Sequence, residues 1–170
     1  MQQTVEQYVQ RILGYLGSQD PMRVQAATVG KIERLLKGVP AAKLKKRPAP
    51  GKWSVGEILA HLADDEMVVG YRMRSILGAP GMRLAAFDQD RWAESQNYAK
   101  RDPKMSLRLL QALREANLIL LKSLRAEQWK QFGIHSERGE ETIERIVAMV
   151  AGHDINHLRQ IETILAAKKK

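Results

Sequence analysis

Apolar residues recur every three to four positions in five segments of the chain, which is the period of an amphipathic helix. None of these segments alternates apolar and polar residues between turn residues, so the sequence predicts no sheet. A shorter helix is expected in the middle of the chain, around residues 88–96. The main helices are predicted at residues 3–17, 20–37, 54–78, 103–125 and 141–166.

Polar residues and prolines mark where these helices begin. Asp20 and Asp102 each precede a proline, and this order favours a helix start because aspartate caps free amides while proline suits the first helical position. Ser54 and Glu57 form a capping box, in which each side chain accepts a hydrogen bond from the backbone N–H of the other residue. The helix that starts at residue 54 is therefore the best marked of the chain.

The connections between the predicted helices are short or moderate in length. Residues 40–51 are rich in proline, and residues 126–140 are expected to form a long irregular turn. Helices joined in this way predict an all-α antiparallel four-helix bundle with an extra short N-terminal helix. A chain of 170 residues has the length of one ordinary domain, so we expect a single domain over residues 1–170.

The chain contains no cysteine, which limits the chemistry that its own side chains can perform. This absence excludes disulfide bonds, thiolate metal ligands and a cysteine nucleophile. The N-terminal segment is too polar for a signal peptide, and no run of 18 apolar residues occurs that could cross a bilayer. We therefore expect a soluble, cytoplasmic protein without a membrane partner.

The net charge of +9 raises the question of an anionic partner. Basic residues gather in residues 43–47 and in the C-terminal residues 168–170. Aromatic residues make up only 5% of the chain and do not alternate with the basic ones, so no stacking platform for nucleic acid is apparent. We expect solvated surface charge, no nucleic-acid partner, and a small-molecule substrate.

Two of the four histidines, His153 and His157, are four residues apart and therefore share one helix face. The apolar stripe of that helix includes Val150 and Ile161, and the two histidines occupy the stripe positions between them. Two imidazoles buried side by side cost about 1–3 kcal/mol each unless their nitrogen atoms find partners. A divalent metal ion would provide such a partner, because neutral imidazole nitrogen is a common metal ligand.

His61 is the third candidate ligand, among apolar positions of the helix predicted at 54–78. The alternative for a single histidine is a hydrogen-bond network in the core. Three nitrogen ligands with one open position are typical of a catalytic metal site. Asp64 and Asp65 follow three and four residues later and could reach the same face, as a fourth ligand or an outer partner, and Asp154 could orient an imidazole.

Several segments carry a family resemblance. Residues 50–66, PGKWSVGEILAHLADDE, and residues 151–161, AGHDINHLRQI, resemble the signature segments of the DinB-like superfamily, also called YfiT-like bundles. Residues 135–142, HSERGEET, lead into the second segment and are similar to the family too, as are 87–93 and 113–117. The resemblance covers nearly the whole chain, and the two histidine segments are its specific parts.

The resemblance implies a four-helix bundle with a three-histidine site for nickel, zinc or a similar divalent ion. Carried over residue by residue, it names His61, His153 and His157 as the metal ligands. It also implies a possible homodimer. The better understood relatives include thiol-dependent S-transferases and isomerases, while others are labelled hydrolases.

These observations lead to three hypotheses about function. The first is a metal-dependent S-transferase that uses a low-molecular-weight thiol as cosubstrate, since a metal-bound thiol ionises near neutral pH. The second is a hydrolase that uses metal-bound water, with Asp64 or Glu57 as general base. The third is a non-catalytic binding module.

Two further residues are candidates for a catalytic role. Arg114 interrupts a leucine-lined helix and could either pair with a buried carboxylate or grip an anionic substrate. His135 precedes the last helix and could either fix a loop or contact the substrate. Both alternatives are open from the sequence for each residue.

Overall fold

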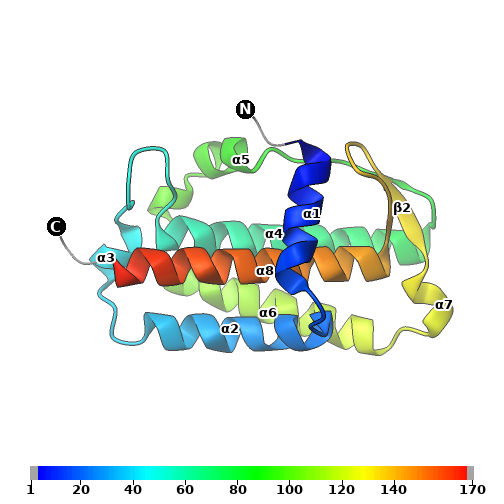
Figure 1. Ribbon diagram of the computed structural model, residues 1–170, viewed down its shortest axis with the longest axis horizontal. Helices are drawn as coiled ribbons and strands as arrows, with labels where there is room; N and C mark the ends of the chain where they lie inside the picture. The colour runs from blue at the N-terminus through cyan, green and yellow to red at the C-terminus, as the bar shows by residue number, and fades with distance from the viewer. Residues whose placement is uncertain (1–3, 168–170) are drawn as a thin grey trace.

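The structure is a computed structural model that describes residues 4–167. Four long helices lie side by side along the longest axis, and a fifth crosses them near the N-terminus (Figure 1). Around the bundle, α2 packs on α8, α8 on α4, α4 on α6 and α6 on α2, while α1 packs across α8. The long helices are α1 (Val5–Leu16), α2 (Pro21–Leu36), α4 (Val55–Gly78), α6 (Pro103–Lys122) and α8 (Ile143–Ala166).

The predicted four-helix bundle with an additional N-terminal helix is confirmed, and its helix directions follow from one long connection. Helices α4 and α8 run antiparallel, but α6 runs parallel to its neighbour α4, because the crossover formed by residues 79–102 returns the chain to the end where α4 begins (Figure 1). This crossover contains α5 (Gln89–Ser95) and the 3₁₀ helix η1 (Tyr98–Lys100). It runs along one side of α4.

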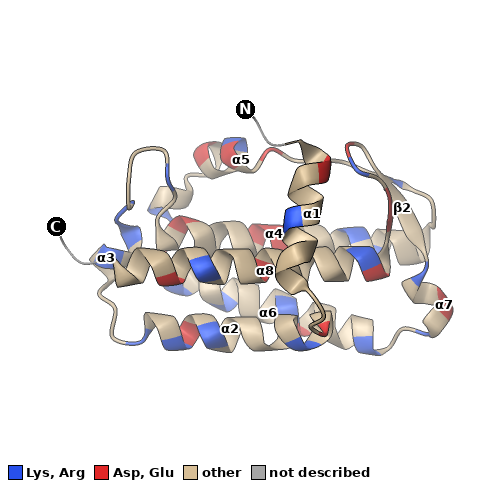
Figure 2. Cartoon of the chain, viewed as in Figure 1, with Lys and Arg blue, Asp and Glu red and all other residues tan. Residues whose placement is uncertain are grey.

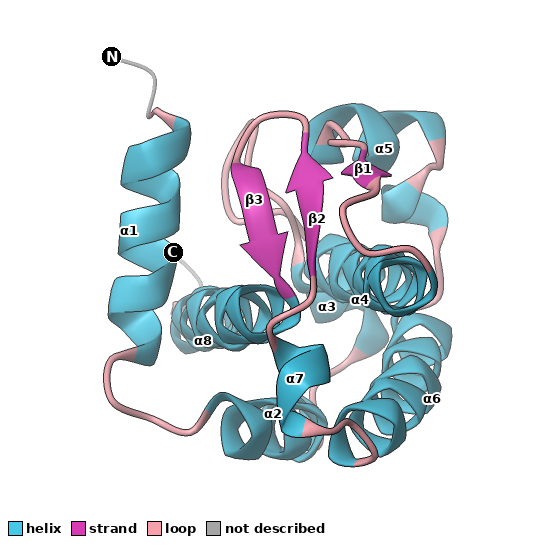
Figure 3. Ribbon diagram, turned by 90° about the vertical axis from the view of Figure 1, so that its right-hand side faces the viewer, coloured by secondary structure: helices cyan, strands magenta, loops and turns pink. Residues whose placement is uncertain are grey.

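The prediction of an irregular turn in the region before α8 is wrong, because residues 126–142 contain strands. This region contains the short helix α7 (Ala126–Trp129) and an antiparallel hairpin of β2 (Phe132–His135) and β3 (Gly139–Thr142). β1 (Arg83–Leu84) pairs in parallel with β2, and the resulting three-stranded sheet lies at one end of the bundle (Figure 3). Strands of two to four residues are too short to show a period-two pattern, which explains the failed prediction.

The predicted helix starts are confirmed by hydrogen bonds. Asp20 accepts from the amide of Met22 at 2.8 Å, and the Ser54 hydroxyl accepts from the amide of Glu57 at 3.2 Å. The Glu57 carboxylate accepts in return from the Ser54 amide at 2.8 Å and also pairs with Arg47. The start of α4, and with it the height of its side chains in the bundle, is fixed by this capping box.

Two apolar clusters fill the bundle at either end of its length. One is centred on Ile58, Leu62 and Leu110, and the other on Met73, Ile76 and Val147. No helix among residues 4–167 has the length and hydropathy needed to span a membrane.

Charged residues of both signs are scattered along the long helices (Figure 2). The basic segment at 43–47 overlaps the second half of α3 (Ala41–Lys45). It lies near the C-terminal end of α8, where the Lys43 ammonium donates to the carbonyl oxygen of Leu165 at 2.9 Å. The second predicted basic cluster, residues 168–170, lies outside the described residues.

Candidate metal centre

The three predicted histidine ligands meet between α4 and α8. The Nε2 atom of His153 lies 3.1 Å from Nε2 of His61 and 3.0 Å from Nε2 of His157. One ring nitrogen from each residue falls within a group whose atoms are all within 4.8 Å of one another. All three side chains are buried. The antiparallel course of α4 and α8 brings the second turn of one helix to the middle of the other.

The spacing and the protonation of these nitrogen atoms fit a bound divalent ion. Imidazole nitrogens at 2.0–2.1 Å from a tetrahedral ion are about 3.3 Å apart, close to the two distances between Nε2 atoms. Nδ1 of His157 contacts the Oε1 atom of Gln160 at 2.9 Å; the amide oxygen is an acceptor, so Nδ1 carries the proton and Nε2 offers its lone pair. Ring nitrogen lone pairs that point toward one another are stabilised by a cation placed between them.

Burial keeps the imidazoles of His61 and His157 neutral at neutral pH. It lowers the pKa of His61 to about 4, with a further contribution from the neighbouring His153. Burial and the other two histidines also hold the pKa of His157 well below its usual value. Neutral imidazole is the form that binds a metal ion, so the site does not need to release a proton from these two residues at pH 7.

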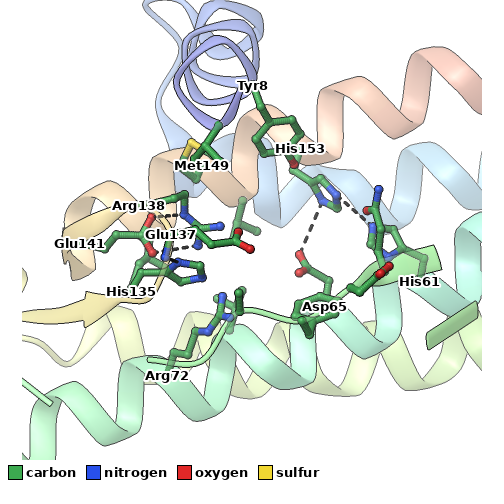
Figure 4. Close-up of a pocket in the computed structure, with 18 of the residues that line it drawn as sticks. Tyr8, His61, Asp65, Arg72, His135, Glu137, Arg138, Glu141, Met149 and His153 are labelled. Atoms are coloured by element: carbon green, nitrogen blue, oxygen red, sulfur yellow. Dashed lines mark hydrogen bonds and ion pairs between the residues drawn. The ribbon is translucent and has the colours of Figure 1, made fainter. Parts of the chain in front are cut away.

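A cavity of about 510 Å³ extends from the histidine cluster toward the sheet. Tyr8 from α1 borders it, and Figure 4 shows the phenol beside His153 with Asp65 facing them from α4. The cavity is in the size range of small-molecule sites. Other residues along its wall are His61, Arg72, His135, Glu137, Arg138 and Glu141.

A second cavity, of about 620 Å³, adjoins the cluster through His157. Tyr8 and His153 line both cavities. The second cavity is basic and aromatic in character, with Arg159 placed over the Tyr15 ring at 4.6 Å from its centroid. The histidine cluster thus lies where two separate spaces meet.

Residues 26–161 match the model of the DinB superfamily. The chain belongs to the DinB superfamily. The matched range contains the three histidines but leaves out helix α1, which brings Tyr8 to both cavities.

Relatives within the DinB superfamily carry the name "Putative metal-dependent hydrolase". One from Oceanobacillus iheyensis is 28% identical over 124 residues, covering 73% of this chain and 71% of its own. Another, YfiT from Bacillus subtilis, is 30% identical over 112 residues, covering 65% and 63%. A third, from Halalkalibacterium halodurans, is 27% identical over 149 residues, covering 88% and 82%.

Two solved structures share the fold. YfiT from Bacillus subtilis, described as "a probable metal-dependent hydrolase with an unusual four-helix bundle topology", matches with a TM-score of 0.79 at 22% identity, over 96% of this chain and 88% of YfiT. The mycothiol-dependent maleylpyruvate isomerase matches with a TM-score of 0.64 at 11% identity, over 86% of this chain and 60% of the isomerase.

The two acids predicted beside the metal are placed differently in this DinB-superfamily chain. The carboxylate of Asp64 accepts from the Tyr98 hydroxyl at 2.7 Å and from Arg101 at 2.8 Å, both in the crossover. Both oxygen atoms of Asp64 are thus engaged by the crossover, and its catalytic role stays a prediction. Asp65 instead borders the first cavity, with its Oδ2 atom 3.6 Å from Nδ1 of His153.

Glu57 is likewise unavailable as a general base, because its carboxylate is held by the capping box and by Arg47. Burial acts to raise the pKa of Glu57, but the hydrogen bonds from Arg47 and Ser54 outweigh it and hold that pKa below its usual value. The group is therefore ionised and engaged rather than poised to take a proton.

Arg114 pairs with buried carboxylates, which was one of its two predicted alternatives. Its guanidinium donates to Asp154 at 2.6 and 3.1 Å and lies 2.8 Å from Glu66. The structure therefore shows the pairing alternative, whereas the catalytic role of Arg114 stays a prediction. Asp154 serves this ion pair, and not an imidazole.

His135 and three residues that the sequence did not single out lie in the cavity wall. His135 stands on β2 and lines the cavity, and its contact with a substrate stays a prediction. Arg72 lies eleven residues after His61, and this spacing of about three turns is a signal that could have placed both on one face. Tyr8 and Glu137 lie on α1 and in the hairpin turn, whose positions depend on tertiary packing.

Proposed function

We propose that this chain is a metal-dependent hydrolase that holds one divalent ion, zinc or nickel, with His61, His153 and His157 and acts on a small molecule. The convergence of three buried imidazole Nε2 atoms beside a cavity of suitable size carries this proposal. The names of the DinB-superfamily relatives support hydrolysis as the reaction.

The residues around the cluster suit this chemistry. A bound divalent ion supplies Lewis-acid activation, which makes water or a thiol more acidic. His61, His153 and His157 hold the ion, and Gln160 keeps the proton of His157 on Nδ1. Asp65 is the carboxylate next to the cluster that faces the cavity, so we assign it the role of general base.

A thiol-dependent S-transferase is the second candidate. Its support is the meeting of two cavities at His153, which gives room for two reactants on either side of one centre. The chain has no cysteine, so the sulfur would come from a low-molecular-weight thiol. One protein of similar fold is mycothiol-dependent.

An activity screen separates the two candidates. Zinc- and nickel-loaded protein is offered ester and amide substrates, and monochlorobimane with bacillithiol, mycothiol or glutathione. We expect thiol-independent turnover that falls about 100-fold or more in Asp65→Asn, the lower end of the range for acid–base groups. Glu115→Gln, which alters an exposed carboxylate on α6, is the matched control and should keep full activity.

Turnover only in the presence of a thiol would favour the S-transferase over the hydrolase. Turnover that is unchanged in His157→Ala and after chelation would reject the proposal, since neither reaction would then depend on the metal.

A further inference from the structure

Arg72 is a buried cation without an acidic partner. Its side chain is 6% exposed, and one Nη2–H donates to the carbonyl oxygen of Ala85. The guanidinium also lies 5.9 Å from the centroid of the Phe87 ring, and it forms no ion pair with any other residue between 4 and 167. Burial lowers the pKa of Arg72, as expected for a cation removed from water without a close counter-ion.

His135 brings a second unused donor to the same wall. Its side chain is 2% exposed, and its Nδ1 atom accepts from the amide of Glu137 at 3.2 Å. The proton of the neutral ring therefore sits on Nε2. Nε2 has no hydrogen-bond partner within the described part of the chain, and a buried donor without an acceptor is costly.

Both side chains line the cavity that begins at the histidine cluster, and Figure 4 shows Arg72 rising from α4 toward the His135 ring. The guanidinium N–H groups and the Nε2–H group can only donate. We propose that Arg72 and His135 form a subsite for one carboxylate group of a small-molecule ligand. The carboxylate accepts hydrogen bonds from both side chains and supplies the counter-ion that Arg72 lacks.

The charges of the surrounding groups favour a carboxylate over a phosphate dianion. Arg138 is already paired with Glu141 at 2.7 and 2.9 Å, so Arg72 is the cation of this wall that pairs with no carboxylate among residues 4–167. Asp65 and Glu137 also border the cavity and would repel a second negative charge. A single negative charge balances Arg72, and these carboxylates repel it less than they would repel a dianion.

The position of the subsite defines the shape of the ligand. Arg72 follows His61 by eleven residues on α4, so the two residues share a face about 16 Å apart along the helix axis. Asp65 lies between them on the cavity wall. The ligand is thus an elongated carboxylic acid whose other end reaches the histidines. The identification of this ligand as the substrate rests on the function proposed above. Carboxylate binding at Arg72 is independent of that function.

Nuclear magnetic resonance titration with butyrate and with butyramide, which have nearly the same shape, tests the subsite. The full chain is used twice, loaded with zinc and stripped by a chelator, and the Nε signal of Arg72 and the Nε2 signal of His135 are followed. We expect butyrate to shift both signals in both preparations. It should bind about ten-fold or more tightly than butyramide, because hydrogen bonds to a charged group are stronger.

Arg72→Met keeps the length of the side chain and removes the charge, and it should reduce butyrate affinity to that of butyramide. Arg83→Met changes the net charge equally at an exposed position outside the cavity and should leave the ten-fold preference intact. His135→Phe, which removes the second donor, should weaken butyrate without abolishing its preference.

Equal affinity of the two probes for the wild-type chain would overturn the subsite, and this result does not depend on any variant folding. Inorganic phosphate binding more tightly than butyrate would overturn the assignment to a monoanion. Butyrate that shifts only the signals of the zinc-loaded histidines would also overturn it. If the chain binds no zinc while butyrate still shifts Arg72 and His135, the proposed function fails and the carboxylate subsite stands.

Discussion

Replacing Arg114 by alanine is expected to lower the free energy of unfolding by about 3–5 kcal/mol, the range for breaking a buried ion pair from one side. The guanidinium is 3% exposed and lies between Glu66 and Asp154, which are equally buried. Alanine would leave two carboxylates close together without a counter-ion. Urea denaturation followed by circular dichroism at pH 7 measures the loss.

The pH dependence of this loss distinguishes buried charge from lost packing. Burial already raises the pKa of Glu66 above its usual value, and loss of the Arg114 charge should raise it further. The folded variant then takes up protons between pH 7 and pH 5 while the unfolded chain does not, so the penalty should be smaller at pH 5. Arg108→Ala, at an exposed site on the same helix, should change stability by less than about 0.5 kcal/mol. A loss below 1 kcal/mol for Arg114→Ala would contradict a structural role for the ion pair.

Gly152→Ala is expected to separate α1 from α8 in part. A Cβ atom at this position would lie 2.8 Å from the carbonyl carbon of Ile12, and closer still to its oxygen. A backbone carbonyl in a helix cannot relieve the clash by a change of rotamer, as a side chain can, so the two helices must move apart. We expect a loss of about 2–3 kcal/mol in unfolding free energy, the upper part of the range for overpacking.

The displacement caused by Gly152→Ala should be confined to α1 and its contacts. Faster amide exchange in α1 than in α4 would show that α1 is the element that moves, and the environment of Tyr8 should change with it. Gly14→Ala is the matched control within α1, because its Cβ would meet nothing within 4 Å. It should stabilise the helix by about 0.5–1 kcal/mol. Equal effects of the two alanines on stability would contradict the close contact of α1 with α8.

The helices and the histidine positions could be predicted because their signals are local. The capping box of Ser54 and Glu57 and the spacing of His153 and His157 need only neighbouring residues to be interpreted. The structure brings His61 to that pair because α4 and α8 are antiparallel neighbours.

The surroundings of the cluster could not be predicted because they depend on helix rotation and on distant segments. Asp64 and Asp65 differ by about 100° around α4, and only the packed bundle decides which one faces the cavity. Tyr98 and Arg101 then hold Asp64, and both come from the crossover. The sequence leaves two roles open for Arg114, because its partners Glu66 and Asp154 lie on two other helices.

Metal titration of the chelator-stripped chain by isothermal calorimetry, with elemental analysis of the product, most directly tests whether the three histidines form one metal site. We predict one zinc or nickel ion per chain, and no such site after joint replacement of His61, His153 and His157 by alanine. Circular dichroism confirms that the triple variant keeps its helices. A wild-type chain that binds no divalent ion, or a folded triple variant that binds one equally well, would contradict the three-histidine centre.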